Sequence, residues 1–432
     1  EHRFWMDGAE RLAPGQAYRR VVRLPDGSVL NRYWDDLPEP RPESYRPDDE
    51  VGQTLPPDRR EAFYRNVRAT AESGWDFSSR WMRDPSDLRT LETVDLLPVD
   101  LNSLLYHAER TIAALRAFRG RKGDAEVARR FAEAAERRRR SLLAAAWDPQ
   151  GGFFYDVRWR TDERVSDRPT LAATAPLYFG LATEEQGRTV ARQLERAFLK
   201  PGGFVTTLIA SGQQWDAPNG WPPLEWLAIE GVRRYGSAGL ADTAAARWLA
   251  LNRRTWRATG RMMEKYDVED LSRGAGGGEY PTQDGFGWTN GVALALGAQR
   301  ASGTPRGDAD RKAGKPRHQI ERAAEGGDVG PERAHPGIAA ALQSGDFGLG
   351  GLQPARQCCL GNPAEAPEAP QGFLRGERQP AQAALGQSPA DLLLEPLLVS
   401  RPFRLLAPHP LLHPNPRLSG FPFSWTLVLS NH

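Results

Sequence analysis

Four segments of the sequence combine carboxylates with Trp, Tyr, Asn, Gln and Arg side chains, and they span residues 31–45, 73–81, 212–221 and 263–288. Aromatic faces cover the C–H side of a sugar ring, while amide, guanidinium and carboxylate groups bond its hydroxyls. Cleaving a glycosidic bond also requires one carboxylic acid to protonate the leaving oxygen and a second carboxylate to activate water or attack. The residue types therefore indicate a carbohydrate site with candidate acid–base chemistry.

Asp76 and Glu264 are the first candidates for that chemistry, and each also has a purely structural interpretation. Asp76 precedes Phe77, where it could cap a helix, because Asp is among the favoured N-cap residues. Glu264 could be a solvated charge at a helix end, paired with Lys265 or Arg261.

Glu279 follows a run of glycines, which allow a backbone to approach a ligand closely. Spacing alone does not decide whether Glu264 or Glu279 would act as the base. Trp215 and Trp221 fit two roles equally well, as core aromatics that lock a loop or as platforms for a sugar.

Charge and periodicity exclude several other classes of function. The formal net charge of +2 provides no broad basic field for nucleic acid. No run of about 18 apolar residues predicts a membrane span. His2 and His107 are isolated, so we expect no metal site, and Arg273–Gly278 lacks the Lys and Ser/Thr of a phosphate loop.

Helical periodicity dominates the segments that must position these loops. A β-hairpin is expected from 20–24 and 28–30 around Asp26–Gly27, and the run Arg137–Arg140 is expected on an exposed helix face. Asp100 is the expected N-cap of the first long helix. The helices are expected at 100–120, 125–147, 171–181, 186–199, 223–235 and 240–263. Helix pairs joined by long, residue-rich loops favour an all-α fold, an α/α toroid with a loop-built cleft at one end.

The composition changes near residue 300. Residues 301–432 hold 17 of the 35 prolines, whereas all ten tyrosines lie at or before Tyr280. Such a density of Pro interrupts helices. We therefore expect 299–432 to be a disordered, low-order Pro-rich tail, derived from a shifted reading frame or from fused unrelated sequence.

The polar segments closely resemble the signature segments of trehalases, glycoside hydrolase family 37. Thr282 stands where that family commonly has Leu, and the resemblance runs from about Trp5 to Val292. The matching segments, in the order of the family, are Asn31–Asp36, Arg41–Ser44, Ser73–Trp81, Pro98–Leu104, Gln213–Trp221 and Gly278–Trp288.

The resemblance implies a fold and an activity. The fold would be an (α/α)6 toroid, of which residues 1–298 form the C-terminal portion. The activity would be inverting hydrolysis of α,α-trehalose to two glucose molecules. Asp76 would be the general acid and Glu264 the base, with their carboxyl groups roughly 6.5–9.5 Å apart to admit water. Trp75 and Phe77 are expected to keep Asp76 protonated while Glu264 stays ionised.

The resemblance also implies which residues bind substrate and what else the protein needs. Arg41, Glu43, Gly74 and Glu279 would contact the sugar. We expect no cofactor, a small-molecule substrate, no nucleic-acid or membrane partner, and a monomer. The family favours the periplasm and leaves the cytoplasm open.

Two segments of the family are absent here: an early Pro-Gly-Gly-Arg-Phe signature and an Asn-Gly-x-Arg block. Both supply sugar contacts and early helices, so the toroid is expected to be partial and to expose apolar helix faces. The chain also lacks an initiator Met, so we expect the natural start upstream. We expect weak or absent activity and poor solubility. Alternatives are a non-catalytic sugar-binding remnant and another inverting α-glucosidase of the (α/α)6 class.

Overall fold

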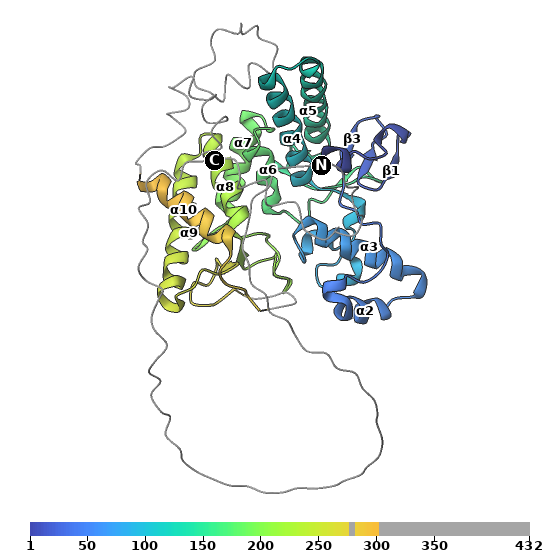
Figure 1. Ribbon diagram of the computed structural model, residues 1–432. Helices are drawn as coiled ribbons and strands as arrows, with labels where there is room; N and C mark the ends of the chain where they lie inside the picture. Colours follow the sequence, from blue (N-terminus) through green and yellow to red (C-terminus); the bar gives the residue numbers. More distant parts are fainter. Residues whose placement is uncertain (276–280, 302–432) are drawn as a thin grey trace, which may run out of the picture. The chain divides into compact units, whose positions relative to one another are not determined.

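Helices form most of the secondary structure in a computed structural model that describes residues 1–275 and 281–301 (Figure 1). The α-helices are α1 (His2–Trp5), α2 (Tyr45–Gln53), α3 (Pro57–Ser73), α4 (Val99–Arg119), α5 (Asp124–Ala146), α6 (Ala175–Tyr178), α7 (Glu184–Gln193), α8 (Pro222–Arg234), α9 (Ala238–Thr259) and α10 (Gly287–Ala301). Short 3-10 helices are η1 (Ala9–Arg11), η2 (Pro42–Ser44), η3 (Ser79–Trp81), η4 (Leu88–Thr90), η5 (Thr93–Asp95) and η6 (Leu171–Thr174), and η7 (Leu194–Phe198) is a π-helical segment. Of the predicted tail at 299–432, residues 299–301 belong to α10, and the remainder lies outside the described residues.

The strands are short and belong to small antiparallel sheets. They are β1 (Gln16–Tyr18), β2 (Val21–Arg23), β3 (Val29–Asn31), β4 (Leu96–Leu97), β5 (Trp147–Asp148), β6 (Phe153–Phe154), β7 (Val157–Arg158), β8 (Glu163–Arg164), β9 (Leu199–Lys200), β10 (Gly203–Phe204), β11 (Asn219–Gly220) and β12 (Tyr266–Asp267). β2 and β3 form the predicted hairpin, with Val22 opposite Leu30, and β1 adds a third strand. In the turn, the carboxylate of Asp26 accepts hydrogen bonds from Ser28, and Gly27 takes φ +83°.

α4 and α5 form a helical hairpin (Figure 1). α4 ends at Gly120, whose φ of +63° is the left-handed conformation that favours glycine at a helix C-terminus. Asp100, however, is not the N-cap of α4. Pro98 occupies that position, and the carboxylate of Asp100 pairs with Arg80 instead.

A buried ion pair fixes the hairpin to the first sheet. Arg138 on α5 is 3% exposed and contacts Glu109 on α4, with an N–O distance of 2.9 Å. The same guanidinium donates to the side-chain oxygens of Asn31 and Asn102. The expected exposed face was therefore wrong at Arg138, although Arg137 and Arg140 are exposed.

α8 packs against α9 and α10 (Figure 1). One hydrophobic cluster includes side chains from the loops that follow α3 and α9. Among its members, Trp75, Trp81, Trp221, Trp226 and Trp248 are less than 2% exposed. Each such ring removes a large apolar area from water, so the core stabilises the segments on either side of the candidate polar residues.

Candidate active site

Asp76 lies in the loop after α3, between two side chains that are anchored in the core. Gly74 ends the helix with φ +75°, and the Ser73 hydroxyl accepts a hydrogen bond of 3.0 Å from the Trp75 amide. Trp75 and Phe77 are 0% and 1% exposed, whereas the side chain of Asp76 is 36% exposed. The buried neighbours thus direct the carboxylate of Asp76 away from the core.

The interpretation of Asp76 as a helix cap is wrong. The next helix, η3, begins at Ser79, and its cap is Ser78, whose hydroxyl accepts from the Arg80 amide at 3.1 Å. Asp76 therefore lies outside that helix and does not cap it.

Arg80 fixes one side of this loop. Its guanidinium forms bidentate hydrogen bonds with Asp100, at 2.7 and 2.8 Å, and with Asp156, at 2.7 and 3.0 Å. It also lies 4.5 Å from the Trp75 ring centroid and 4.2 Å from that of Trp81. A planar cation with two carboxylates and two aromatic rings is held in one geometry, which fixes the loop that carries Asp76.

Asp216 fixes the other side of the loop. Its buried carboxylate accepts from the Ser78 hydroxyl at 2.7 Å and from the amide and hydroxyl of Ser79 at 2.7 and 2.9 Å. The hydroxyls of Thr207 and Ser211 also donate to it. Burial raises the pKa of Asp216, although these donors act in the opposite direction. Sequence analysis did not single out this carboxylate as the anchor.

Glu264 follows α9, which ends at the left-handed Gly260. Its side chain is 3% exposed, its amide donates to the carbonyl of Gln283 at 2.9 Å, and its Oε2 lies 2.9 Å from Nζ of Lys265. The suggested pairing with Lys265 is confirmed, but the solvated position is wrong. Arg261 pairs with Asp284.

One glutamine connects the two candidate carboxylate segments. Nε2 of Gln214 donates to the main-chain carbonyl of Asp76 at 2.6 Å, and its Oε1 accepts from Nζ of Lys265 at 3.0 Å. Lys265 in turn contacts Glu264. The structure therefore brings the segments of Asp76 and Glu264 into one neighbourhood. The separation of their carboxyl groups stays a prediction.

Arg41 reaches this neighbourhood from the loop before α2. Its Nη1 lies 3.9 Å from Oδ2 of Asp76, and its other nitrogens bond Asp48 at 2.7 and 2.9 Å. The guanidinium also lies 4.9 Å from the ring centroid of Phe77. Glu43, in η2, is exposed. Of these two predicted sugar contacts, Arg41 has a direct geometric relation to the candidate acid.

Trp34 in the preceding segment is held by charged groups. The guanidinium carbons of Arg32 and Arg65 each lie 4.5 Å from its ring centroid. Its amide donates to Glu72 at 2.8 Å, and burial raises the pKa of that carboxyl to about 7. These contacts fix the 31–36 segment.

Trp215 and Trp221 belong to a buried aromatic stack. Their rings are 3.7 Å apart and nearly parallel, and Trp75 stacks against Trp215 at 5.5 Å. Trp288 meets Trp221 edge to face at 5.9 Å. Exposures of 2% and 1% favour the core role over the sugar platform for Trp215 and Trp221. Glu279 lies outside the described residues.

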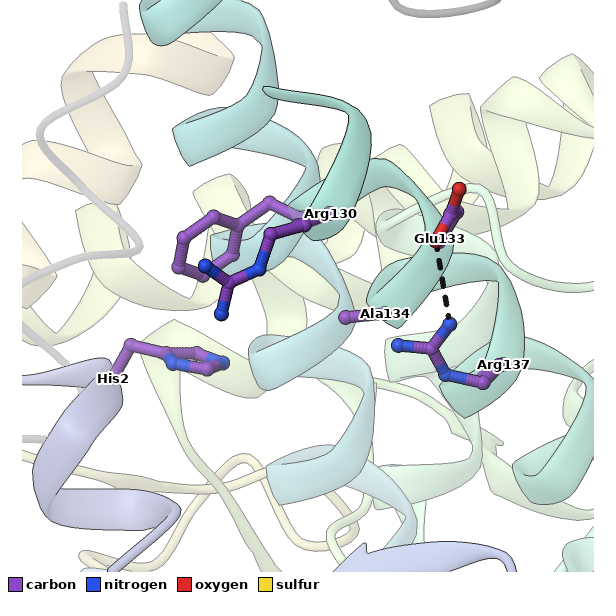
Figure 2. A pocket seen from close by; sticks show the side chains of 6 residues that line it. His2, Arg130, Glu133, Ala134 and Arg137 are labelled. Atoms are coloured by element: carbon purple, nitrogen blue, oxygen red, sulfur yellow. Dashed lines mark ion pairs between the residues drawn. The ribbon is translucent and has the colours of Figure 1, made fainter. Parts of the chain in front are cut away.

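A separate pocket lies between α1 and α5 and contains none of the candidate site residues. Figure 2 shows His2 facing Arg130, and the dashed line marks the 3.8 Å contact between Glu133 and Arg137.

The described residues contain no group of three or more His, Cys, Asp or Glu side chains that could hold a metal ion. Within residues 1–275 and 281–301, no helix has the length and apolar content to cross a membrane.

The sequence profile of the trehalase family matches residues 1–298. The chain belongs to the trehalase family. It is 46% identical over 296 residues to a periplasmic trehalase of Xanthomonas axonopodis pv. citri (strain 306), and 44% identical to one of Salmonella newport (strain SL254). Each alignment covers 68% of this chain and 51% of the relative, so the chain spans about half the length of these relatives.

A solved structure shares the fold. The neutral trehalase Nth1 from Saccharomyces cerevisiae superposes with a TM-score of 0.51 at 24% identity, covering 68% of this chain and 58% of the yeast chain. The expected all-α trehalase fold is confirmed over that portion. At this level of identity the likeness shows the fold alone.

Proposed function

We propose that this chain carries the acid–base pair of a glycoside hydrolase that converts α,α-trehalose to two glucose molecules with inversion. The single observation that carries the proposal is the bridge through Gln214, which joins the segments of Asp76 and Glu264. Family membership supplies the substrate. Because the chain spans about half of its relatives, the activity is a proposal for this chain.

In this proposal Asp76 protonates the oxygen between the two glucose units, while Glu264 takes a proton from the attacking water. Arg41, Glu43, Gly74 and Glu279 bind the sugar. The half-exposed carboxylate of Asp76 is accessible from solvent, whereas the buried Glu264 is held by Lys265. That difference suits an acid facing a leaving group and a base held in a fixed position.

The names of the relatives support the periplasm as the compartment of this chain. We propose in addition that the chain acts as a monomer without a cofactor.

The test is glucose release from trehalose by the purified chain, compared with its Asp76→Asn and Glu264→Gln variants. We expect weak release by the wild-type chain and loss of at least about 100-fold in each variant, the scale of general acid–base catalysis. Asp95→Asn is the matched control, because the Asp95 side chain is 32% exposed and paired with Arg160, outside the site. Equal release by wild type and both variants would reject catalysis by these residues.

Proton NMR of the fresh products tests the stereochemistry. Inversion at one anomeric carbon gives one β-glucose and one α-glucose, whereas retention gives α-glucose alone. Faster cleavage of maltose than of trehalose would instead support another inverting α-glucosidase.

The chain spans about half the length of its relatives, and this favours one second candidate function, a protein that binds the sugar without hydrolysing it. Calorimetric titration with trehalose distinguishes it: heat of binding without glucose release supports this candidate, and glucose release that depends on Asp76 rejects it.

A further inference from the structure

Gln214 is 1% exposed, and its side chain spans two segments that are distant in sequence. Its partner Asp76 is 138 positions away, and its partner Lys265 is 51 positions away. A buried amide that satisfies groups on both sides links those segments directly, because breaking either bond leaves a polar group without its partner in the core.

The chemistry of the partners fixes the orientation of this amide. A main-chain carbonyl only accepts hydrogen bonds, and a lysine ammonium only donates them. The amide of Gln214 must therefore direct its nitrogen to the carbonyl of Asp76 and its oxygen to Lys265. The reversed amide would place acceptor against acceptor at Asp76 and donor against donor at Lys265.

Lys265 extends the link to the second carboxylate. It is 0% exposed, and its Nζ lies 2.9 Å from Oε2 of Glu264 and 5.1 Å from the ring centroid of Trp221. A charge removed from water needs such partners. The ammonium group thus holds the Glu264 carboxylate at a defined distance from Gln214.

The middle of the link is attached to the core. The main-chain carbonyl of Gln214 accepts from Nε1 of Trp221 at 2.9 Å and from Nδ2 of Asn219 at 3.0 Å. Asn219 lies in β11, which pairs with β12 directly after Lys265. The amide therefore projects from a fixed backbone, so displacement at one end is resisted at the other.

We propose that Gln214 and Lys265 are positioning residues that set the separation between Asp76 and Glu264. They act through those two residues: Gln214 holds the main chain at Asp76, and Lys265 holds the carboxylate of Glu264. Their importance for turnover rests on the proposed function, whereas the mechanical link between the two segments does not.

The first test is amide hydrogen exchange, read by mass spectrometry over peptides that contain residues 74–78 and 262–267. In Gln214→Met, which removes the bonds to Asp76 and Lys265, we expect exchange to increase at least about threefold in both peptides. Gln193→Met is the matched control, because Nε2 of Gln193 also donates to a main-chain carbonyl, that of Gly151 at 3.1 Å. We expect it to change neither peptide.

Lys265→Met tests transmission along the link, because Lys265 bonds Gln214 and Glu264, and Gln214 in turn bonds the carbonyl of Asp76. We expect exchange to rise in the 74–78 peptide as well as in 262–267. Lys265→Arg keeps a buried donor and should restore part of the wild-type protection. An effect of Lys265→Met confined to 262–267 would overturn the link. If Lys265→Met does not fold, Gln214→Met and Lys265→Arg decide the question.

Steady-state kinetics then test the catalytic consequence. We expect Gln214→Met to lower kcat by roughly 10- to 100-fold with KM within about threefold, because misplacement of a catalytic group affects the reaction step. The Gln214→Met/Lys265→Met double variant should lose no more than the worse single variant. Increased exchange with unchanged kcat would overturn the positioning role. A wild-type chain that releases no glucose refutes the proposed function, and the exchange experiment still decides the link.

Discussion

The guanidinium of Arg41 lies 3.9 Å from the carboxylate of Asp76 and is oriented by Asp48, which accepts three hydrogen bonds from Arg41. The side chains of Arg41 and Asp48 are 4% and 2% exposed, so the pair is buried. Asp48 thus determines where the cation meets the candidate acid.

Asp48→Asn should lower the free energy of unfolding by about 3 kcal/mol, because the buried Arg41 guanidinium loses the carboxylate that it bonds most closely. Glucose release should also fall, since Arg41 loses the fork that orients it. Urea unfolding and the glucose assay measure the two effects. Glu50→Gln on the same helix is the control, because Glu50 forms an exposed pair with Arg46. A loss as large in the control would contradict the assignment.

Arg80→Met should destabilise the protein by roughly 3–5 kcal/mol, because Asp100 and Asp156 would face each other without a buried cation. The measurement is urea unfolding at neutral pH. Adding Asp100→Asn and Asp156→Asn to Arg80→Met should recover part of the loss, since both carboxylate charges are then gone. A triple variant no more stable than the single one would show that charge is not the cause.

Asp216→Asn should lower the free energy of unfolding by about 1–3 kcal/mol, because one acceptor oxygen becomes a donor beside the groups of Ser78 and Ser79. The loop that carries Asp76 should loosen, so glucose release should fall with stability. Ser211→Ala removes one of the donors to the same carboxylate and should have a smaller effect on both quantities. Thermal unfolding of the two variants gives the comparison, and equal losses would argue against Asp216 as the anchor.

Local signals predicted the three longest helices of the described residues, α4, α5 and α9. The apolar period and the glycine at position 120 indicated α4, and the Asp26–Gly27 turn indicated the β2–β3 hairpin. α3 was missed, because charged residues surround its buried side chains Phe63 and Val67 and obscure the apolar stripe. α10 was also missed.

Tertiary contacts decided the features that local signals could not. Asp100 has the residue type of an N-cap, but Arg80 recruits its carboxylate from 20 positions away. Arg138 sits within a charged run and is nevertheless buried by Glu109. Sequence patterns contain no information on either partner.

The candidate site was likewise predicted in part. Family motifs identified Asp76 and Glu264 as candidates, but the connection through Gln214 and Lys265 depends on the packing of separate loops. Trp215 illustrates the same limit: its burial and the rings that stack against it favour the core role, and neither can be read from the sequence.

Glu225 is a fully buried carboxyl that the proposed chemistry does not use. Its Oε1 accepts from the Phe204 amide at 2.6 Å, and its Oε2 has no hydrogen-bond partner among the described residues. Burial raises the pKa of Glu225 well above its ordinary value of 4.5. Between pH 4.5 and the raised pKa of the folded state, the unfolded chain has released this proton while the folded chain keeps it. The free energy of unfolding therefore falls as pH rises through this range.

Glu225→Gln should therefore reduce this fall in the free energy of unfolding, because the amide stays neutral at every pH. At the higher pH values of the range, the variant should be more stable than wild type. The measurement is urea unfolding of both proteins between pH 5 and 8, where about one unit of difference in proton uptake corresponds to 1.4 kcal/mol per pH unit. Parallel curves would contradict a protonated Glu225.

Glu109→Gln provides the opposite case. Burial alone would raise the pKa of Glu109, but Arg138 and His2 lower it below the ordinary value. This carboxylate contributes stability above pH 4.5 that is lost as pH falls through its folded pKa, so its removal should destabilise the protein at neutral pH. At pH 7, Glu225→Gln should raise the free energy of unfolding and Glu109→Gln should lower it. Such a result would show that the surroundings of each carboxyl, and not burial alone, determine which protonation state the fold stabilises.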